Sequence, residues 1–190
     1  MGRVRDGIDD DVRRFVEAQP LFFVATAPRR GRINVSPKGL DGTFRILDEG
    51  TVAYLDLTGS GAETVAHLRD DGRITFLFCA FEDPPRLVRL HGRGEAVLPG
   101  DPRWAELRAG FPDLPGVRAI VVAEIDRVAD SCGFGVPRMR FEGQRDHLPR
   151  WTRARGDEEA LARYRRRRNA VSIDGLPAFD EPPSPRLYGS

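Results

Sequence analysis

The stretch Leu55–Leu68 reads Leu-Asp-Leu-Thr-Gly-Ser-Gly-Ala-Glu-Thr-Val-Ala-His-Leu, and the rest of the chain is organised around it. The apolar run Thr51–Leu57 predicts a β-strand that ends in a turn with two glycines. A short helix is expected after the turn, because apolar residues recur there at helical spacing. The stretch therefore predicts a strand, a glycine-rich turn and a helix in succession.

This turn has two interpretations. Glycines at 59 and 61 let the backbone approach a ligand closely, and the N-terminus of the following helix offers unpaired N–H groups and the positive end of a dipole. Together these features suit a phosphate. Alternatively, Ser60 and Glu63 have the spacing of a capping box, which would satisfy the same N–H groups internally. The pattern alone leaves both interpretations open.

Composition narrows the class of protein. A chain of 190 residues with a net charge of +1 predicts a single domain over 1–190 without an electrostatic preference for nucleic acid or membranes. No apolar run approaches the roughly 20 residues that cross a bilayer. Cys79 and Cys132 are too few for a disulfide framework, and neither belongs to a cluster with zinc spacing, so no metal site is expected. The expected location is the cytoplasm. The basic run Arg163–Arg168 is better explained by a helix C-terminus, so nucleic acid is not the expected partner.

Lys38 is the only lysine among 30 basic residues. It ends the segment Asn-Val-Ser-Pro-Lys that begins at Asn34, and a lysine retained in an arginine-rich chain can mark a place where a compact ammonium group is needed. Chance survival on the surface is the other interpretation. If this segment lies near Thr51–Leu57, Lys38 could reach a bound phosphate or an electron-rich ring.

Short β-rich runs with hairpin-length links favour an antiparallel barrel over a parallel α/β sheet. Helices are expected within residues 9–19 and over residues 146–168. The barrel core is expected within residues 10–130. Residues 131–190 then supply a glycine-rich loop, a C-terminal helix and an extended tail.

Several segments together resemble the pyridoxamine 5′-phosphate oxidase-like family of flavin-binding split barrels. They are Phe22–Ala27, Asn34–Leu40 (NVSPKGL), Tyr54–Leu68 (YLDLTGSGAETVAHL), Arg73–Phe81 (RITFLFCAF) and Arg86–Gly94 (RLVRLHGRG). The chain also resembles a group of members that carry Ser-Cys-Gly-Phe-Gly-Val-Pro and Asn-Ala-x-Ser-Ile-Asp-Gly-Leu-Pro, here at Ser131–Pro137 and Asn169–Pro177. The resemblance implies a mainly β (α+β) fold, a six-stranded antiparallel split β-barrel with peripheral helices. It also implies a homodimer that holds FMN in a groove between its subunits.

The resemblance further implies roles for particular residues. Residues matching the strand along the flavin ring are Asn34, Ser36, Pro37 and Lys38. Residues matching the phosphate grip are Leu57, Thr58, Ser60, Gly61 and Thr64. Two residues match a strand that lines the groove from the second subunit, Arg86 and Arg89. The loop with Cys132, Gly133 and Phe134 is expected to cover the substrate side. No catalytic residue can be named.

The chain also departs from the family pattern. The true oxidase holds the FMN phosphate with a Ser-Arg-Lys clamp, whereas the helix here starts Ser60-Gly61-Ala62-Glu63-Thr64 without a cation. Hydroxyls and N–H groups would then hold the phosphate, helped by Lys38 or by an arginine from elsewhere. Arg186–Gly189 lacks the C-terminal proline of the true oxidase, so pyridoxamine phosphate is not the expected substrate.

The expected function is therefore that of an FMN-dependent oxidoreductase with a small-molecule substrate and a nicotinamide electron donor. One alternative keeps the fold and changes the cofactor to a deazaflavin such as F420, or to haem. Another is a flavin-binding or storage protein without turnover, because no acid–base pair is legible in the sequence.

Overall fold

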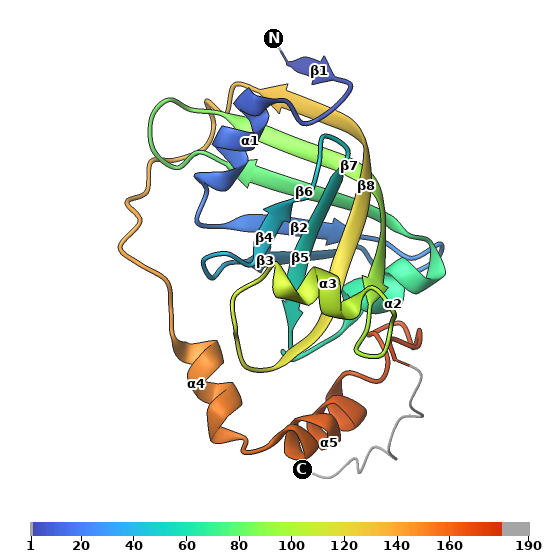
Figure 1. The fold of residues 1–190 in the computed structure, drawn as a ribbon. Helices are drawn as coiled ribbons and strands as arrows, with labels where there is room; N and C mark the ends of the chain where they lie inside the picture. The colour runs from blue at the N-terminus through green and yellow to red at the C-terminus, as the bar shows by residue number, and fades with distance from the viewer. Residues whose placement is uncertain (1, 180–190) are drawn as a thin grey trace.

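The computed structural model describes residues 2–179 (Figure 1). The elements in chain order are β1 (Arg3–Arg5), α1 (Asp10–Glu17), β2 (Phe22–Thr26), β3 (Asn34–Lys38), β4 (Phe44–Ile46), β5 (Thr51–Leu57), α2 (Glu63–Asp70), β6 (Arg73–Cys79), β7 (Leu87–Val97), α3 (Trp104–Ala109), β8 (Val117–Ser131), α4 (His147–Ala154) and α5 (Glu158–Arg168). The segment Arg186–Gly189, where the oxidase proline is missing, lies outside the described residues.

The strands form one curled antiparallel sheet in the order β3-β2-β6-β7-β8-β5-β4, with β1 paired to β8. Its two ends meet through side chains: the rings of Phe22 on β2 and Phe44 on β4 have centroids 4.9 Å apart. Likewise, Lys38 on β3 reaches Asp56 on β5. The sheet therefore closes as a split barrel, and the predicted mainly β antiparallel fold is confirmed. The predicted count of six strands was too low, because the sheet has eight. The three-residue β1 is too short to show an alternating pattern.

The main core fills the inside of the curl. Aromatic rings pack together there from opposite strands, namely Phe22, Phe44, Tyr54, Phe76 and Phe78. Val12 and Val16 of α1 join the same cluster, so this helix covers one end of the barrel. Alternation along β2 and β5 points every second side chain inward, which places Asp56 on the same face of β5 as Val52 and Tyr54.

The long strands β7 and β8 bend at Gly92, where their register shifts next to His91. A Cβ atom at Gly92 would lie 1.9 Å from the carbonyl oxygen of Glu124, so only glycine fits between the two backbones. The register shift at this position is a β-bulge.

Helices pack on the outer side of the sheet. Trp104 and Leu107 of α3 pack against Ala53 and Leu55 of β5, so β5 is buried on both faces. The predicted single helix over residues 146–168 is instead two helices, α4 and α5. The chain breaks at Gly156, whose φ of 100° is left-handed, and the Asp157 side chain then caps α5 by accepting the N–H of Ala160.

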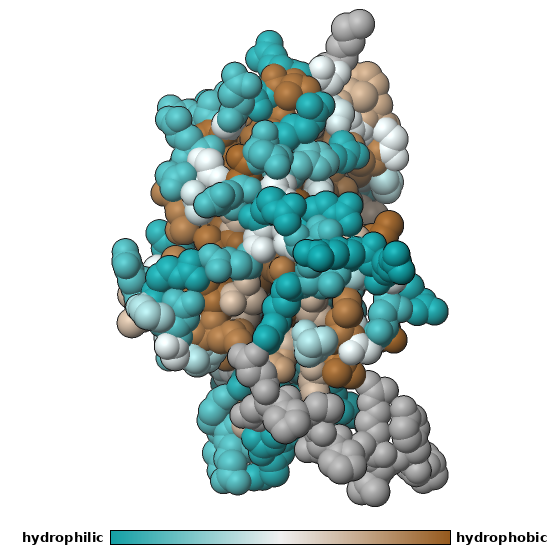
Figure 2. Space-filling model, turned by 90° about the vertical axis from the view of Figure 1, so that its right-hand side faces the viewer, coloured by the Kyte–Doolittle hydropathy of each residue, from teal (hydrophilic) through white to brown (hydrophobic). Residues whose placement is uncertain are grey.

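On the face shown in Figure 2, hydrophobic patches alternate with hydrophilic residues. Over residues 2–179, none of the helices has the length and apolar character required to span a bilayer.

Candidate functional site

A groove of about 1670 Å³ runs along the split between the ends of the sheet. One wall comes from β3, whose polar side chains Asn34, Ser36 and Lys38 share a face through strand alternation. Pro37 also lines the groove. It lies on the edge strand β3, and an edge strand tolerates a proline because one of its sides has no neighbouring strand to bond.

The opposite wall is formed by the turn between β5 and α2. Leu57, Gly59, Ser60 and Gly61 line the groove. No side chain within residues 2–179 caps the N-terminus of α2, whose N-cap residue is Ala62. The Glu63 carboxylate instead accepts the N–H of Ile173 at 3.3 Å, so the capping box between Ser60 and Glu63 does not form. The helix N-terminus is thus left without the internal cap that the sequence allowed.

Two predicted phosphate ligands turn away from the groove. The Thr58 hydroxyl is buried; it donates to the carbonyl of Gly116 at 2.9 Å and accepts from Nε of Arg165 at 2.8 Å. Thr64 is buried as well. Neither side chain is among those that line the groove.

Lys38 is held by a buried carboxylate. Its Nζ lies 3.1 Å from Oδ1 of Asp56 and 5.6 Å from the centre of the Tyr54 ring. The other oxygen of Asp56 accepts from Nε of Arg118 at 2.7 Å. Burial acts to raise the pKa of Asp56, but the charges of Arg118 and Lys38 outweigh it and hold this pKa below its usual value. Asp56 is therefore a carboxylate shared between two cations.

The same cluster reaches the C-terminal part of the chain. Nη1 of Arg118 donates to Oδ1 of Asn169 at 2.7 Å, and Nδ2 of Asn169 donates to the carbonyl of Gly59 at 3.1 Å. Asn169 is fully buried just after α5. The segment that begins at Asn169 therefore supports the groove turn from behind.

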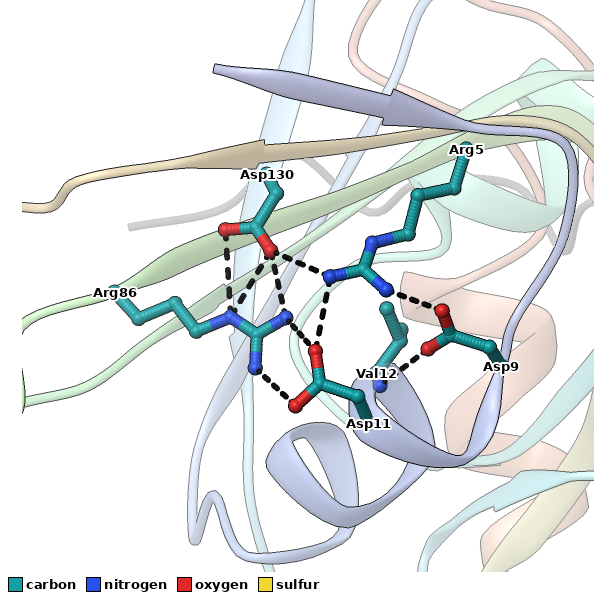
Figure 3. Close-up of polar contacts among 6 residues, drawn as sticks. All are labelled: Arg5, Asp9, Asp11, Val12, Arg86 and Asp130. Carbon is teal, nitrogen blue, oxygen red and sulfur yellow. Dashed lines mark hydrogen bonds and ion pairs between the residues drawn. The ribbon is translucent and has the colours of Figure 1, made fainter. Parts of the chain in front are cut away.

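Arg86 lines the groove, but its guanidinium belongs to an ion-pair cluster (Figure 3). Its Nε and Nη2 donate to Asp130, while Nη1 and Nη2 donate to Asp11. Arg5 pairs with both of these carboxylates and with Asp9 (Figure 3). The cluster joins β1 and α1 to the β7–β8 end of the sheet.

Arg89 and the glycine-rich loop lie apart from Lys38. Arg89 donates to the Ser131 hydroxyl at 3.1 Å and does not line the groove. Cys132 and Phe134 are exposed, whereas Gly133 is buried against the backbone of Arg86. Phe134 lines a smaller pocket of about 220 Å³, which shares residues 80–83 with the groove.

Sequence reasoning gave no site role to Asp56, Arg118 or Asn169, although Asn169 begins one of the segments that carry the family resemblance. A signal existed for the first two, since each places a charge inside an apolar strand. Asp56 and Arg118 pair on neighbouring strands, β5 and β8. Only the register of those strands brings the two charges together.

Comparisons with known proteins give consistent results. The family model for pyridoxamine 5′-phosphate oxidase matches residues 8–132. The pyridoxamine 5′-phosphate oxidase family protein ustO of Aspergillus flavus is 41% identical over 190 residues, covering 92% of this chain and 76% of that protein.

Among solved structures, HupZ from Group A Streptococcus has a TM-score of 0.51 at 22% identity, covering 65% of this chain and 99% of its own. An FAD-binding protein from Mesorhizobium loti has a TM-score of 0.50 at 15% identity, with coverages of 68% and 96%. At these identities the two structures show a likeness of fold.

Proposed function

The chain belongs to the pyridoxamine 5′-phosphate oxidase family, and on that premise we propose that it binds FMN in the groove and acts as a flavin-dependent oxidoreductase. The observation that carries this proposal is the composition of one groove. Polar side chains of β3, the cations Lys38 and Arg118, and the glycine turn before α2 all line it.

The groove residues fit such a cofactor. FMN combines a flat ring system with polar edges and a chain that ends in a phosphate. Phe44 and Leu57 supply apolar surface, Asn34 and Ser36 supply hydrogen-bonding groups, and the turn at Gly59–Gly61 supplies backbone beside an uncapped helix. The volume exceeds the roughly 300–1,000 Å³ of usual ligand pockets, so a substrate has room beside the ring. The Mesorhizobium loti protein of similar fold is described as FAD-binding, which also supports a flavin.

A bound flavin supplies hydride transfer, which no side chain of the chain can perform. The residues of the chain orient the cofactor and set the charge around it. Lys38 places an ammonium group at the wall of the groove, held in position by Asp56. The carboxamide of Asn34 and the hydroxyl of Ser36 bond to each other at 3.1 Å, so they face the groove as a preorganised pair.

The proposal includes a homodimer. Ile33 and Val35 are 73% and 61% exposed at the open edge of the sheet, next to the groove wall. A second copy that covers this edge would bury the exposed apolar surface. Light scattering of the purified chain measures the mass directly; a monomer at working concentration would contradict this part of the proposal.

The test of cofactor binding is to identify what co-purifies with the protein. Acid release followed by mass spectrometry is expected to yield FMN. Lys38→Met should lower the amount retained, whereas Arg103→Gln should not, because Arg103 pairs on the surface with Glu95 and Asp101. Equal retention by both variants would exclude Lys38 from the cofactor site.

Experiments on the same purified protein distinguish two alternative functions. Recovery of a deazaflavin or haem in place of FMN would change the cofactor and keep the groove. For the non-catalytic alternative, stopped-flow reduction by NADH or NADPH is decisive. Reduction of bound FMN that is no faster than that of free FMN would leave a flavin-storage protein as the better description.

A further inference from the structure

The glycine turn provides backbone N–H groups for an anion, but its own side chains supply no positive charge. Residues 59–64 contain one ionisable side chain, Glu63, which is acidic and lines the groove. A phosphate placed here would be repelled by that carboxylate. A cation must therefore come from another element of the fold.

Arg118 on β8 has the required position. It is 6% exposed and lines the groove together with Gly59, Ser60 and Gly61. Its guanidinium is one side chain away from the turn, because Asn169 accepts from Nη1 of Arg118 and donates to the carbonyl of Gly59. Within residues 2–179 the hydrogen bonds of this guanidinium use Nε and Nη1, which leaves Nη2 for a ligand.

The charges of the cluster leave a positive excess. Asp56 is the one carboxylate between Arg118 and Lys38, at 2.7 Å and 3.1 Å. Arg165, which does not line the groove, donates to Thr58 and pairs with Glu158 at 2.5 Å. Within this cluster, one carboxylate for two cations leaves about one positive charge, which the Glu63 carboxylate at the turn partly offsets. In a buried setting this charge acts with little screening by solvent.

We propose that Arg118 is the residue that binds the anionic end of the ligand, and that Asp56 and Asn169 are positioning residues that fix its guanidinium. This inference rests on the proposed function, because the anion is then the phosphate of FMN. Arg118 thus takes the place of the cations that the turn lacks. The C-terminal segment after α5 becomes part of the cofactor site, since Asn169 aligns both the arginine and the turn.

The experiment compares FMN with riboflavin, which has the same ring and no phosphate. Dissociation constants for both are measured by quenching of flavin fluorescence, on wild-type protein freed of ligand. The variants are Arg118→Gln, Glu63→Gln and the surface control Arg103→Gln. Circular dichroism and thermal unfolding establish that each variant is folded.

The wild type is expected to prefer FMN over riboflavin. Arg118→Gln should weaken FMN binding by roughly 10- to 100-fold, the value of a charge-assisted hydrogen bond, and leave riboflavin binding nearly unchanged. Glu63→Gln should strengthen FMN binding by roughly 2- to 5-fold, because it removes a repelling charge from a partly exposed position. Arg103→Gln should change neither value.

Each other outcome has a distinct meaning. If the wild type binds neither flavin, the proposed function fails. If it binds both equally, or if Arg118→Gln keeps the preference for FMN, the role of Arg118 is wrong while flavin binding stands. If Arg118→Gln does not fold, Asn169→Ala takes its place, because it keeps the charge and removes the alignment. An unchanged FMN-to-riboflavin ratio in Asn169→Ala would then overturn the inference.

Discussion

Replacing Asp56 by Asn tests how the groove cluster is held together. The Asp56 side chain is 1% exposed and contacts two cations that differ in burial: the Arg118 side chain is 5% exposed and that of Lys38 is 23% exposed. Asparagine preserves the shape and removes the charge. Arg118 would then be a buried cation without a carboxylate, while Lys38 could turn toward solvent.

The magnitude follows from that difference in burial. Removing one partner of a buried ion pair costs about 3–5 kcal/mol, whereas a partly exposed pair contributes about 0–1 kcal/mol. Asp56→Asn should therefore lower the free energy of unfolding by about 3–5 kcal/mol, and Lys38→Met by less than about 1 kcal/mol. For a chain of this length the first loss corresponds to a fall in Tm of roughly 6–20 °C.

Urea unfolding followed by circular dichroism measures these values, and a double-mutant cycle isolates the pair. Asp56→Asn combined with Arg118→Gln removes both charges, so its cost should be at least about 1 kcal/mol less than the sum of the single costs. Additive costs, or a loss below about 1 kcal/mol for Asp56→Asn, would refute the view that the carboxylate serves mainly the buried arginine.

Three further predictions concern stability. Because the pKa of Asp56 is lowered in the folded state, its stabilising effect is complete above the unfolded pKa near 3.8 and is lost as the pH falls below that value. In acid titrations, the difference in unfolding free energy between wild type and Asp56→Asn should therefore narrow from pH 4 downward. A constant difference would contradict this. Phe22→Ala should cost about 3–5 kcal/mol in urea unfolding, since its ring contacts four other aromatic rings; a cost under about 1 kcal/mol would show that the core collapses around the gap. Asp157→Ala should cost about 1 kcal/mol by the same measurement, because its carboxylate caps α5 at the N–H of Ala160, 2.9 Å away; a neutral result would show that the cap adds nothing.

The strands could be predicted well from sequence because their signals are local. The strand expected over Thr51–Leu57 has the same first and last residues as β5, because its apolar run ends at a glycine turn. The helix over residues 146–168 was not expected to break. Gly156 followed by Asp157 is a signal for a helix end and a new N-cap, but it was overlooked because charged residues continue on both sides.

The candidate site was predictable only in part, for a topological reason. Lys38, Ser60 and Gly61 were singled out by composition and turn chemistry, and the structure places all three along one groove. Arg118 and Asn169 were not singled out, because their meaning depends on contacts between strands and segments far apart in the chain. Thr58 and Thr64 carry suitable hydroxyls, yet both are buried.

Binding of FMN in the groove can be measured by titrating the ligand-free protein into FMN and following the flavin fluorescence. We expect saturable quenching with about one FMN bound per chain. Fluorescence that stays at the level of free FMN as the protein is added would contradict it.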